Sequence, residues 1–325
     1  MTTDRTHYSA IVIGAGIAGI MAARRLHDAG VRTIVLDKGR NFGGRMATWQ
    51  INHSRLDHGA QSIVLDQPKA ADIFKPLVDS DTLKPWYGDF AATHYLATDG
   101  MSAAVKQLAV GLEVHLATRV THLDLAAHQW TIHCDDNRHF NADMLILTPP
   151  APQTLTLLQD SDIPVNEDTI ARLRTVSYDK CLTLMALFDN PLKLTQSGWL
   201  RTDNQAVSWI TDNAVKGLSS TPAIVIQAAP AFSEQHFDQP DQLITDMMLS
   251  SLAPLTSGDP TIVKLHRWRY SQAVVKDPAP YLMTTTPAPL AIAGDCFAGR
   301  QITGAALSGL RAAESLLQHL DIIHS

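Results

Sequence analysis

The stretch "SAIVIGAGIAGIMAARRLHDAGVRTIVLD", residues 9–37, decides the fold. Residues 8–13 form a short apolar run that ends at a glycine, which is typical of a buried strand, and residues 17–29 have the apolar spacing of a helix. Gly30 follows as a helix stop, and residues 32–37 indicate a second buried strand. A strand, a helix and a strand within about thirty residues predict a βαβ unit with parallel strands.

The turn between the first strand and the helix carries glycines in GxGxxG spacing, at Gly14, Gly16 and Gly19. The spacing alone is a weak signal, but here Asp37 closes the next strand, as a ribose-binding acid does in dinucleotide-binding units. We expect Gly14 to allow the tight turn, Gly16 to let the backbone approach a pyrophosphate, and Gly19 to pack the helix on the strand. The free N–H groups of the helix N-terminus favour phosphate. The motif predicts a dinucleotide without saying which one.

The composition is that of a globular chain, with 325 residues, 45% hydrophobic, 18% charged and a net charge of −6. This length allows one large or two medium domains with a full core. The mild acidity argues against a nucleic-acid partner. Cys134, Cys181 and Cys296 are odd in number and widely spaced, which favours a reducing, cytoplasmic location. The apolar run at 9–23 is too short to span a bilayer, so we expect neither export nor a membrane span.

The rest of the chain alternates between helical and strand-like runs. The expected helices lie at about 100–109, 239–252 and 304–320, and the expected strands at 113–125, 129–136, 142–152 and 290–295. Prolines interrupt the strand at 142–152, which suggests a crossing between domains there. The stretch 156–285 differs in character, because strand-like runs surround one helix.

A second glycine loop follows the first βαβ unit. "DKGRNFGGRMAT" (37–48) places Gly44 and Arg45 just past the acidic residue, and the glycine pair gives the backbone a second close approach to a ligand. Arg40 and Arg45 are cations beside a pyrophosphate site. A simple nicotinamide-binding domain needs no such loop. The sequence here resembles flavoproteins of the glutathione-reductase-like class, in the amine-oxidase-like branch, where GGR follows the first βαβ unit and wraps FAD.

The C-terminal stretch "GDCFAGRQITGAALSGLRAA" (294–313) is poor in bulky side chains. In the class that this chain resembles, the segment returns to the nucleotide-binding domain and completes the flavin site. The resemblance implies that Asp295 accepts from the ribityl chain, that Gly294 lies in the bare turn, and that Gly304 and Ala305 leave room for the flavin ring at a helix N-terminus. The alternative is a helix whose small residues serve packing alone.

Several blocks along nearly the whole chain are similar to the renalase family and its bacterial relatives, among them "RLDHGAQSI" (55–63), "SWITDNAVKG" (208–217) and "HRWRYSQA" (266–273). Asn41 stands where a glycine is usual, and Cys296 where an aromatic residue is common. We also count Lys38 and Val120 among the expected cofactor contacts.

The resemblance implies an α/β fold. Its FAD-binding Rossmann-like domain is of the glutathione-reductase or p-hydroxybenzoate-hydroxylase type, and it carries a mixed α+β substrate domain. The expected boundaries are 1–60, 95–155 and 285–325 for a discontinuous FAD-binding domain, with 61–94 and 156–284 in the substrate domain.

The alternation in "HRWRY" supplies the expected catalytic face. On a strand His266, Trp268 and Tyr270 face one side, and Arg267 and Arg269 face the other. An aromatic face with a hydrogen-bond donor suits a flat ring over a flavin. A core strand with an incidental histidine is the alternative. In relatives this stretch lines the flavin pocket, so we assign the three residues to the catalytic site.

The resemblance also implies a reaction. Bacterial renalase-like enzymes oxidise dihydro isomers of NAD(P)H and pass the electrons to O2, so the expected products are NAD(P)⁺ and hydrogen peroxide. Loss of hydride restores an aromatic pyridinium, so the reaction needs little acid–base assistance. An FAD-dependent amine oxidase and a non-catalytic FAD-binding scaffold or redox sensor are the alternative functions.

Two other features point away from additional chemistry. His128, His133, Cys134 and His139 could suggest a metal site, but they lie on an alternating strand that sends successive side chains to opposite faces, so we expect no metal. Cys296 is expected to be a partly buried, inert thiol rather than a covalent attachment point for flavin.

Overall fold

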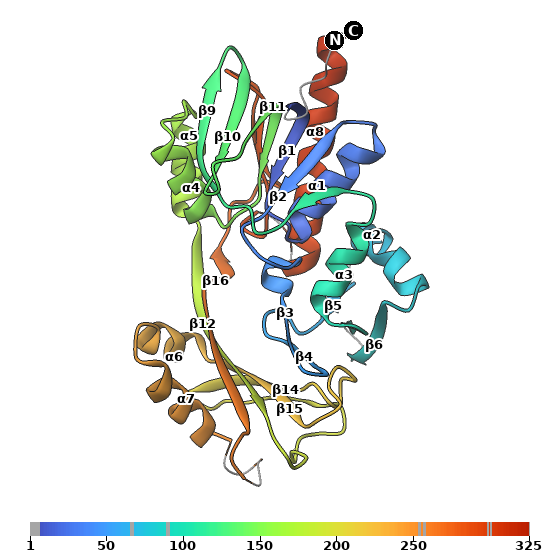
Figure 1. Ribbon diagram of the computed structural model, residues 1–325, viewed down its shortest axis with the longest axis vertical. Helices are drawn as coiled ribbons and strands as arrows, with labels where there is room; N and C mark the ends of the chain where they lie inside the picture. Colours follow the sequence, from blue (N-terminus) through green and yellow to red (C-terminus); the bar gives the residue numbers. More distant parts are fainter. Residues whose placement is uncertain are drawn as a thin grey trace.

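The computed structural model describes residues 7–65, 68–88, 92–252, 255, 258–297, 299 and 301–324. Its largest sheet runs in the order β17–β18–β11–β1–β2–β8, and β10 and β9 continue from β11 (Figure 1). The strands are β1 (His7–Ile13), β2 (Thr33–Leu36), β8 (Glu113–His115), β9 (Val120–Ala126), β10 (Gln129–Cys134), β11 (His139–Leu147), β17 (Leu282–Thr284) and β18 (Leu290–Ile292). Strands β2 and β11 pair in parallel with β1, which confirms the expected βαβ unit.

Alternate side chains of β1 enter two different cores. Ala10 and Val12 pack with helices α1 (Ile17–Asp28) and α8 (Gln301–His324) on one face of the sheet. Ile11 and Ile13 pack on the other face, in a core shared with α4 (Ala151–Asp160) and α5 (Glu167–Thr175). Helix α8 begins three residues before the expected start at Gly304. The sheet is therefore covered by helices on both faces, as a parallel sheet requires.

The expected single strand at 113–125 is wrong, because the structure has two strands there. Strand β8 ends at His115 and β9 begins at Val120, and between them Ala117 has a φ of +50°. A left-handed residue turns the chain, so β8 pairs in parallel with β2 while β9 pairs antiparallel with β10.

Short elements between α1 and α3 (Met101–Leu108) lie beside the N-terminal sheet. They are the short helix η1 (Gly44–Met46), the pair β3 (Thr48–Ile51) and β4 (Ser54–Asp57), helix α2 (Pro68–Asp79), and the small sheet β5 (Ile63–Val64), β7 (Thr93–Ala97) and β6 (Leu83–Gly88). Side chains of α2, β5 and β6 are buried in the same core as α1 and α8.

A second, antiparallel sheet runs in the order β13–β14–β15–β12–β16. Its strands are β12 (Ser177–Leu187), β13 (Trp199–Arg201), β14 (Val207–Asp212), β15 (Ala223–Ala228) and β16 (Ile262–Val275). Helices α6 (Pro230–His236) and α7 (Asp241–Ser250) cover one of its faces. The long strands β12 and β16 lead from this sheet to the N-terminal part, as Figure 1 shows.

The cores suggest a division that differs from the expected boundaries. Ile63, Phe74, Leu77 and Leu83, which lie in the range 61–94 expected in the substrate domain, are buried in the core of α1 and α8. Residue 155, expected as the end of an FAD-binding segment, lies inside α4, and both α4 and α5 pack on the N-terminal sheet. We therefore propose that the nucleotide-binding part includes 61–94 and continues to about residue 176, and that residues 177–275 form the substrate part.

Candidate cofactor and substrate site

A cavity of about 1870 Å³ is lined by residues of both sheets. Fourteen of the sixteen residues predicted for the site line it, namely Gly14, Gly16, Asp37, Lys38, Arg40, Gly44, Arg45, Val120, Gly294, Asp295, Ala305, His266, Trp268 and Tyr270. The other two, Gly19 and Gly304, lie in helices α1 and α8 and do not line it. Residues more than 200 positions apart in the sequence thus share one cavity.

The first glycine loop has the geometry that its motif predicts. Gly14 has a φ of +114°, and a Cβ on Gly19 would lie 1.8 Å from the carbonyl oxygen of Gly14, so Gly19 lets the helix pack on the turn. A Cβ on Gly16 would meet only the Gly43 carbonyl oxygen, at 3.9 Å, and Gly16 faces the cavity. No side chain caps α1, so its first N–H groups are available to an anion.

Asp37 is held at the edge of this loop by backbone groups. Its Oδ2 accepts from the Ala15 N–H at 2.6 Å, and its Oδ1 accepts from the Gly39 N–H at 2.5 Å. Burial raises the pKa of Asp37, and the two N–H donors oppose that rise. A carboxylate has about four acceptor positions, so Asp37 can still accept from ribose hydroxyls. Lys38 donates to Gln153 at 3.3 Å.

The second glycine loop joins the first loop to the C-terminal segment. Gly43 donates to the Ala15 carbonyl at 3.1 Å. The Arg45 guanidinium donates to both carboxylate oxygens of Asp295, at 2.5 and 2.6 Å. The sequence predicted that Arg45 and Asp295 both contact the cofactor, but it did not predict that they pair with each other. The Tyr178 hydroxyl, which sequence reasoning missed, donates to Asp295 at 3.5 Å.

One face of the substrate sheet lines the cavity. Cross-strand pairing places Trp209 opposite Gln227, Gln227 opposite Thr183, and Thr183 opposite His266, so these side chains form a row across four strands. Arg267, the next residue, donates to the Phe237 carbonyl at 2.7 Å on the face that α6 and α7 cover. His266 and Arg267 thus point to opposite faces of β16, as the sequence predicts, whereas the register of β16 shifts between Trp268 and Gln272.

His58 lies among the predicted aromatic residues, although sequence reasoning did not assign it to the site. Its ring stacks on Trp268 with centroids 5.4 Å apart and meets the edge of His266 at 4.9 Å. Trp268 donates from Nε1 to the His58 carbonyl at 2.9 Å. Burial lowers the pKa of His58 to about 4 and also lowers the pKa of His266. Both imidazoles are therefore neutral near pH 7.

Two buried polar side-chain atoms of this segment have no hydrogen-bond partner in the part of the chain that the structure describes. They are Nδ1 of His58 and Oε1 of Gln61. The Gln61 amide nitrogen donates to the carbonyls of Asp57 and Gly59, which fixes the orientation of the amide and leaves Oε1 unpaired. His58 and Gln61 both line the cavity, so a bound ligand could form hydrogen bonds with these two atoms. In the sequence, His58 and Gln61 could have been found from the block "RLDHGAQSI" (55–63), which contains both residues and is similar to the renalase family.

These features fit a long dinucleotide. The two glycine loops and the free N-terminus of α1 would hold its pyrophosphate, Asp37 a ribose, and the turn at Gly294–Asp295 the chain that leads to the flavin ring. The N-terminal end of α8, at Ile302 and Ala305, lines the same cavity. A cavity that continues past this end to Trp268 leaves room for a second molecule.

Metal and thiol chemistry find little support in the structure. Among the residues described, no group of three or more His, Cys, Asp or Glu side chains could hold a metal ion. Cys296 is buried and does not line the cavity, and burial raises the pKa of its thiol to about 12. The thiol is therefore protonated at neutral pH and unreactive. No described helix is long and apolar enough to cross a membrane.

Comparison with known proteins identifies the class. Residues 82–317 match the family model for flavin containing amine oxidoreductases, and residues 12–77 match an NAD(P)-binding Rossmann-like domain. The first match covers more than half of the chain, so the chain belongs to the flavin-containing amine oxidoreductase family. It is an FAD-dependent oxidoreductase that acts on a small molecule.

Within that family the chain is renalase-like. It is 28% identical to mouse renalase over 342 aligned residues, which cover 95% of this chain and 99% of the mouse protein. Over 61 residues, 19% of this chain and 12% of the relative, it is 38% identical to a pseudooxynicotine dehydrogenase of Pseudomonas sp.. The resemblance stated from the sequence is confirmed.

Solved structures show the same fold. A protein from Exiguobacterium sp. 255-15 that is assigned as a protoporphyrinogen oxidase superposes with a TM-score of 0.75 at 12% identity, over 97% of this chain and 99% of the other. Putrescine oxidase bound to putrescine superposes with a TM-score of 0.68 at 14% identity, over 96% and 99%. The expected α/β fold with an FAD-binding Rossmann-like domain is confirmed.

Proposed function

We propose that this protein oxidises a dihydronicotinamide isomer of NAD(P)H and passes the electrons to O2, which yields NAD(P)⁺ and hydrogen peroxide. The observation that carries this proposal is the cluster of His58, His266 and Trp268, whose neutral planar rings form one wall of the cavity. Flat, uncharged rings suit the stacking of a dihydropyridine ring, which is itself flat and uncharged.

The residues of this wall have a limited chemical task. FAD, when bound, accepts a hydride and delivers two electrons to O2. His58, His266 and Trp268 would orient the donor ring and exclude water, so that the reacting atoms approach within about 3–3.5 Å. Loss of hydride leaves an aromatic pyridinium, so no residue has to remove a proton. The lowered pKa values of His58 and His266 make both imidazoles weak bases, which is consistent with this lack of acid–base chemistry.

We propose the same roles for the remaining predicted contacts. The loops at Gly14–Gly19 and Gly44–Arg45 bind the pyrophosphate side of FAD, and Asp295 binds the chain that leads to the flavin. The three cysteines are free and suit a reducing compartment, so we propose a cytoplasmic location.

The test is rapid anaerobic mixing of the FAD-bound protein with dihydronicotinamide isomers, ordinary NADH and primary amines. A dihydronicotinamide isomer should bleach the flavin quickly, whereas NADH and amines should bleach it slowly. Trp268→Ala should retain FAD and lower the reduction rate at limiting donor about ten- to a hundred-fold, because base–aromatic stacking contributes about 1–3 kcal/mol.

The matched control is Val274→Ala, on the same strand, because the Val274 side chain is exposed and does not line the cavity. It should reduce at the rate of the parent protein. If Trp268→Ala is as fast as the parent, the aromatic wall does not bind the donor. If only a primary amine bleaches the flavin, the protein is an amine oxidase. If no donor bleaches it, the scaffold or sensor alternative gains support.

A further inference from the structure

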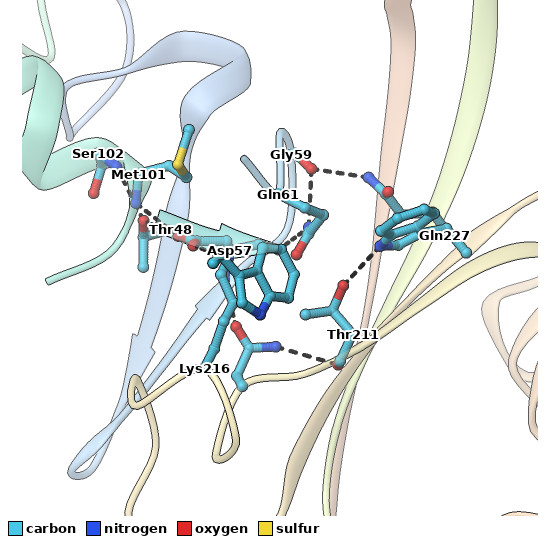
Figure 2. Close-up of polar contacts among 12 residues, drawn as sticks. Thr48, Asp57, Gly59, Gln61, Met101, Ser102, Thr211, Lys216 and Gln227 are labelled. Carbon is cyan, nitrogen blue, oxygen red and sulfur yellow. Dashed lines mark hydrogen bonds and ion pairs between the residues drawn. The ribbon is translucent and has the colours of Figure 1, made fainter. Parts of the chain in front are cut away.

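A buried ion pair joins the two halves of the molecule beside the cavity without lining it. The Lys216 Nζ lies 2.7 Å from the Asp57 Oδ2, and both side chains are fully buried. Asp57 ends β4 in the nucleotide-binding part, whereas Lys216 lies in the turn that follows β14 of the substrate sheet (Figure 2). Desolvation offsets most of the attraction within such a pair, so stability alone is a weak reason for it.

The other carboxylate oxygen of Asp57 also accepts hydrogen bonds. Asp57 Oδ1 accepts from the Thr48 hydroxyl at 2.7 Å and from the Met101 N–H at 2.8 Å, and Thr48 in turn accepts from the Ser102 N–H at 3.1 Å. These are the first N–H groups of α3, whose own N-cap residue, Gly100, has no side chain to offer. The carboxylate therefore caps a helix and holds the lysine at the same time.

One end of this network fixes the turn that carries His58 and Gln61. Asp57 immediately precedes this turn, which is tied to the substrate sheet because the Gly59 carbonyl accepts from the Gln227 side-chain amide at 2.9 Å. A Cβ on Gly59 would lie 2.0 Å from the Arg45 carbonyl oxygen, so the turn also packs directly on the second glycine loop. A shift of Asp57 must move the aromatic wall and that loop together.

The other end reaches a separate wall of the cavity. The Lys216 ammonium lies 4.9 Å from the centre of the Trp86 ring, which meets the edge of Tyr87 at a centroid distance of 4.9 Å. Tyr87 lines the cavity and packs on Trp199 with centroids 4.5 Å apart. The Lys216 ammonium thus contacts both Asp57, which precedes the His58–Gln61 turn, and Trp86, which packs on Tyr87. These two parts of the cavity wall come from different sheets.

We propose that Lys216 and Asp57 are positioning residues, which set the spacing between the His58–Gln61 turn and the Tyr87 wall and so determine the environment of the bound cofactor. Neither residue touches the reacting atoms. The proposal does not depend on which donor reduces the flavin.

The test uses the FAD-bound protein and its Lys216→Met variant, which keeps a long, unbranched side chain and removes its charge. The matched control is Arg172→Met, because Arg172 makes two hydrogen bonds of 2.7 Å to the buried Asp277 but does not line the cavity. Both variants should unfold at lower temperature. Only Lys216→Met should shift the visible absorption bands of the flavin and its midpoint potential in a chemical titration.

The reduction rate by whichever donor is active should also fall about 10- to 100-fold in Lys216→Met, as a displacement of about 1 Å at a reaction site can cause. If no donor reduces even the parent protein, the flavin spectrum and potential still test the positioning role. A Lys216→Met protein that loses stability but keeps the spectrum and potential of the parent would overturn the proposal.

The double variant Asp57→Asn/Lys216→Met covers the case in which the single variant fails to fold. It leaves no unpaired buried charge, and the asparagine Oδ1 can still accept from the Met101 N–H. We expect it to unfold near the temperature of the parent yet to retain the altered flavin spectrum, because the ammonium that joins the two walls is missing. If the double variant has the parent's spectrum, the pair only balances charge and the proposal is wrong.

Discussion

Gly16 and Gly19 belong to one motif but act for different physical reasons. A Cβ on Gly19 would collide with the protein's own backbone, at 1.8 Å from the Gly14 oxygen, whereas a Cβ on Gly16 would make only an ordinary contact, 3.9 Å from the Gly43 carbonyl oxygen. The motif therefore contains one residue that the fold requires and one that a ligand requires.

Alanine substitution should separate these two roles. Gly16→Ala should leave the unfolding free energy of the FAD-free protein within about 0.5 kcal/mol of the parent. It should weaken FAD binding at least about tenfold, because the methyl group occupies space that a pyrophosphate needs. Gly19→Ala should destabilise the FAD-free protein by about 1–3 kcal/mol. Urea unfolding and FAD titration measure both effects, and equal loss of stability in the two variants would contradict this assignment.

His58 should make stability depend on pH in the acid range. The unfolded imidazole takes up a proton near pH 6.5, but burial lowers the pKa in the folded protein to about 4. Between these values the unfolded state binds more protons, so the free energy of unfolding falls as the pH falls. The loss that this group causes, complete at about pH 4, is about 3 kcal/mol.

His58→Asn should remove this part of the pH dependence. The difference in unfolding free energy between parent and variant should therefore change between pH 7 and pH 4, with the parent losing more stability. Chemical unfolding at a series of pH values measures this difference. Parallel profiles for the two proteins would show that His58 is not buried in its neutral form.

Helix α8 shows how small residues can serve packing and ligand space on one element. Its first turn lines the cavity at Ile302 and Ala305, but further along a Cβ on Gly309 would lie 1.9 Å from the carbonyl oxygen of Ala18 in α1. Gly309 thus serves helix packing, whereas Ala305 lines the cavity.

Gly309→Ala should force α1 and α8 apart and lower the free energy of unfolding by about 1–3 kcal/mol. Because α1 carries the first glycine loop, FAD affinity should fall as well. Arg311→Ala is the control on the same helix, since Arg311 makes no ion pair with any residue that the structure describes. Thermal unfolding checks the first effect. Unchanged stability in Gly309→Ala would mean that α1 and α8 can accommodate the added methyl group without loss of packing.

At the level of the whole molecule, the cavity exists only because separate segments converge. The Arg45–Asp295 pair joins residues 250 positions apart, and the turn after His58 bonds to β15 and β16 of the other sheet. A cofactor that spans this cavity should therefore stabilise the protein as a unit.

Adding FAD at about 100 times its dissociation constant should raise the free energy of unfolding by about 2.7 kcal/mol. Riboflavin lacks the pyrophosphate and adenosine and cannot reach the glycine loops, so the same concentration should raise the melting temperature far less. Thermal scans of the FAD-free protein with each compound make the comparison. Equal shifts would indicate that the glycine loops contribute nothing to binding.

The sequence was sufficient for the nucleotide-binding unit because its signals are local. The turn at Gly14, the helix from Ile17 and the acid at Asp37 all lie within thirty residues, and each follows from backbone geometry. The alternation of β16 was equally local, since a strand sends successive side chains to opposite faces. The identity of the cofactor, FAD, was then inferred from the family resemblance.

Only the tertiary structure decided which distant residues meet. Nothing near Lys216 in the sequence points to Asp57, and nothing near Arg45 points to Asp295, because such pairs depend on how the sheets are placed. The role of His58 was hidden for the same reason, since its neutral state comes from burial between β16 and the second glycine loop. Local spacing fixes the backbone's shape, whereas burial and long-range pairing set the chemistry of each side chain.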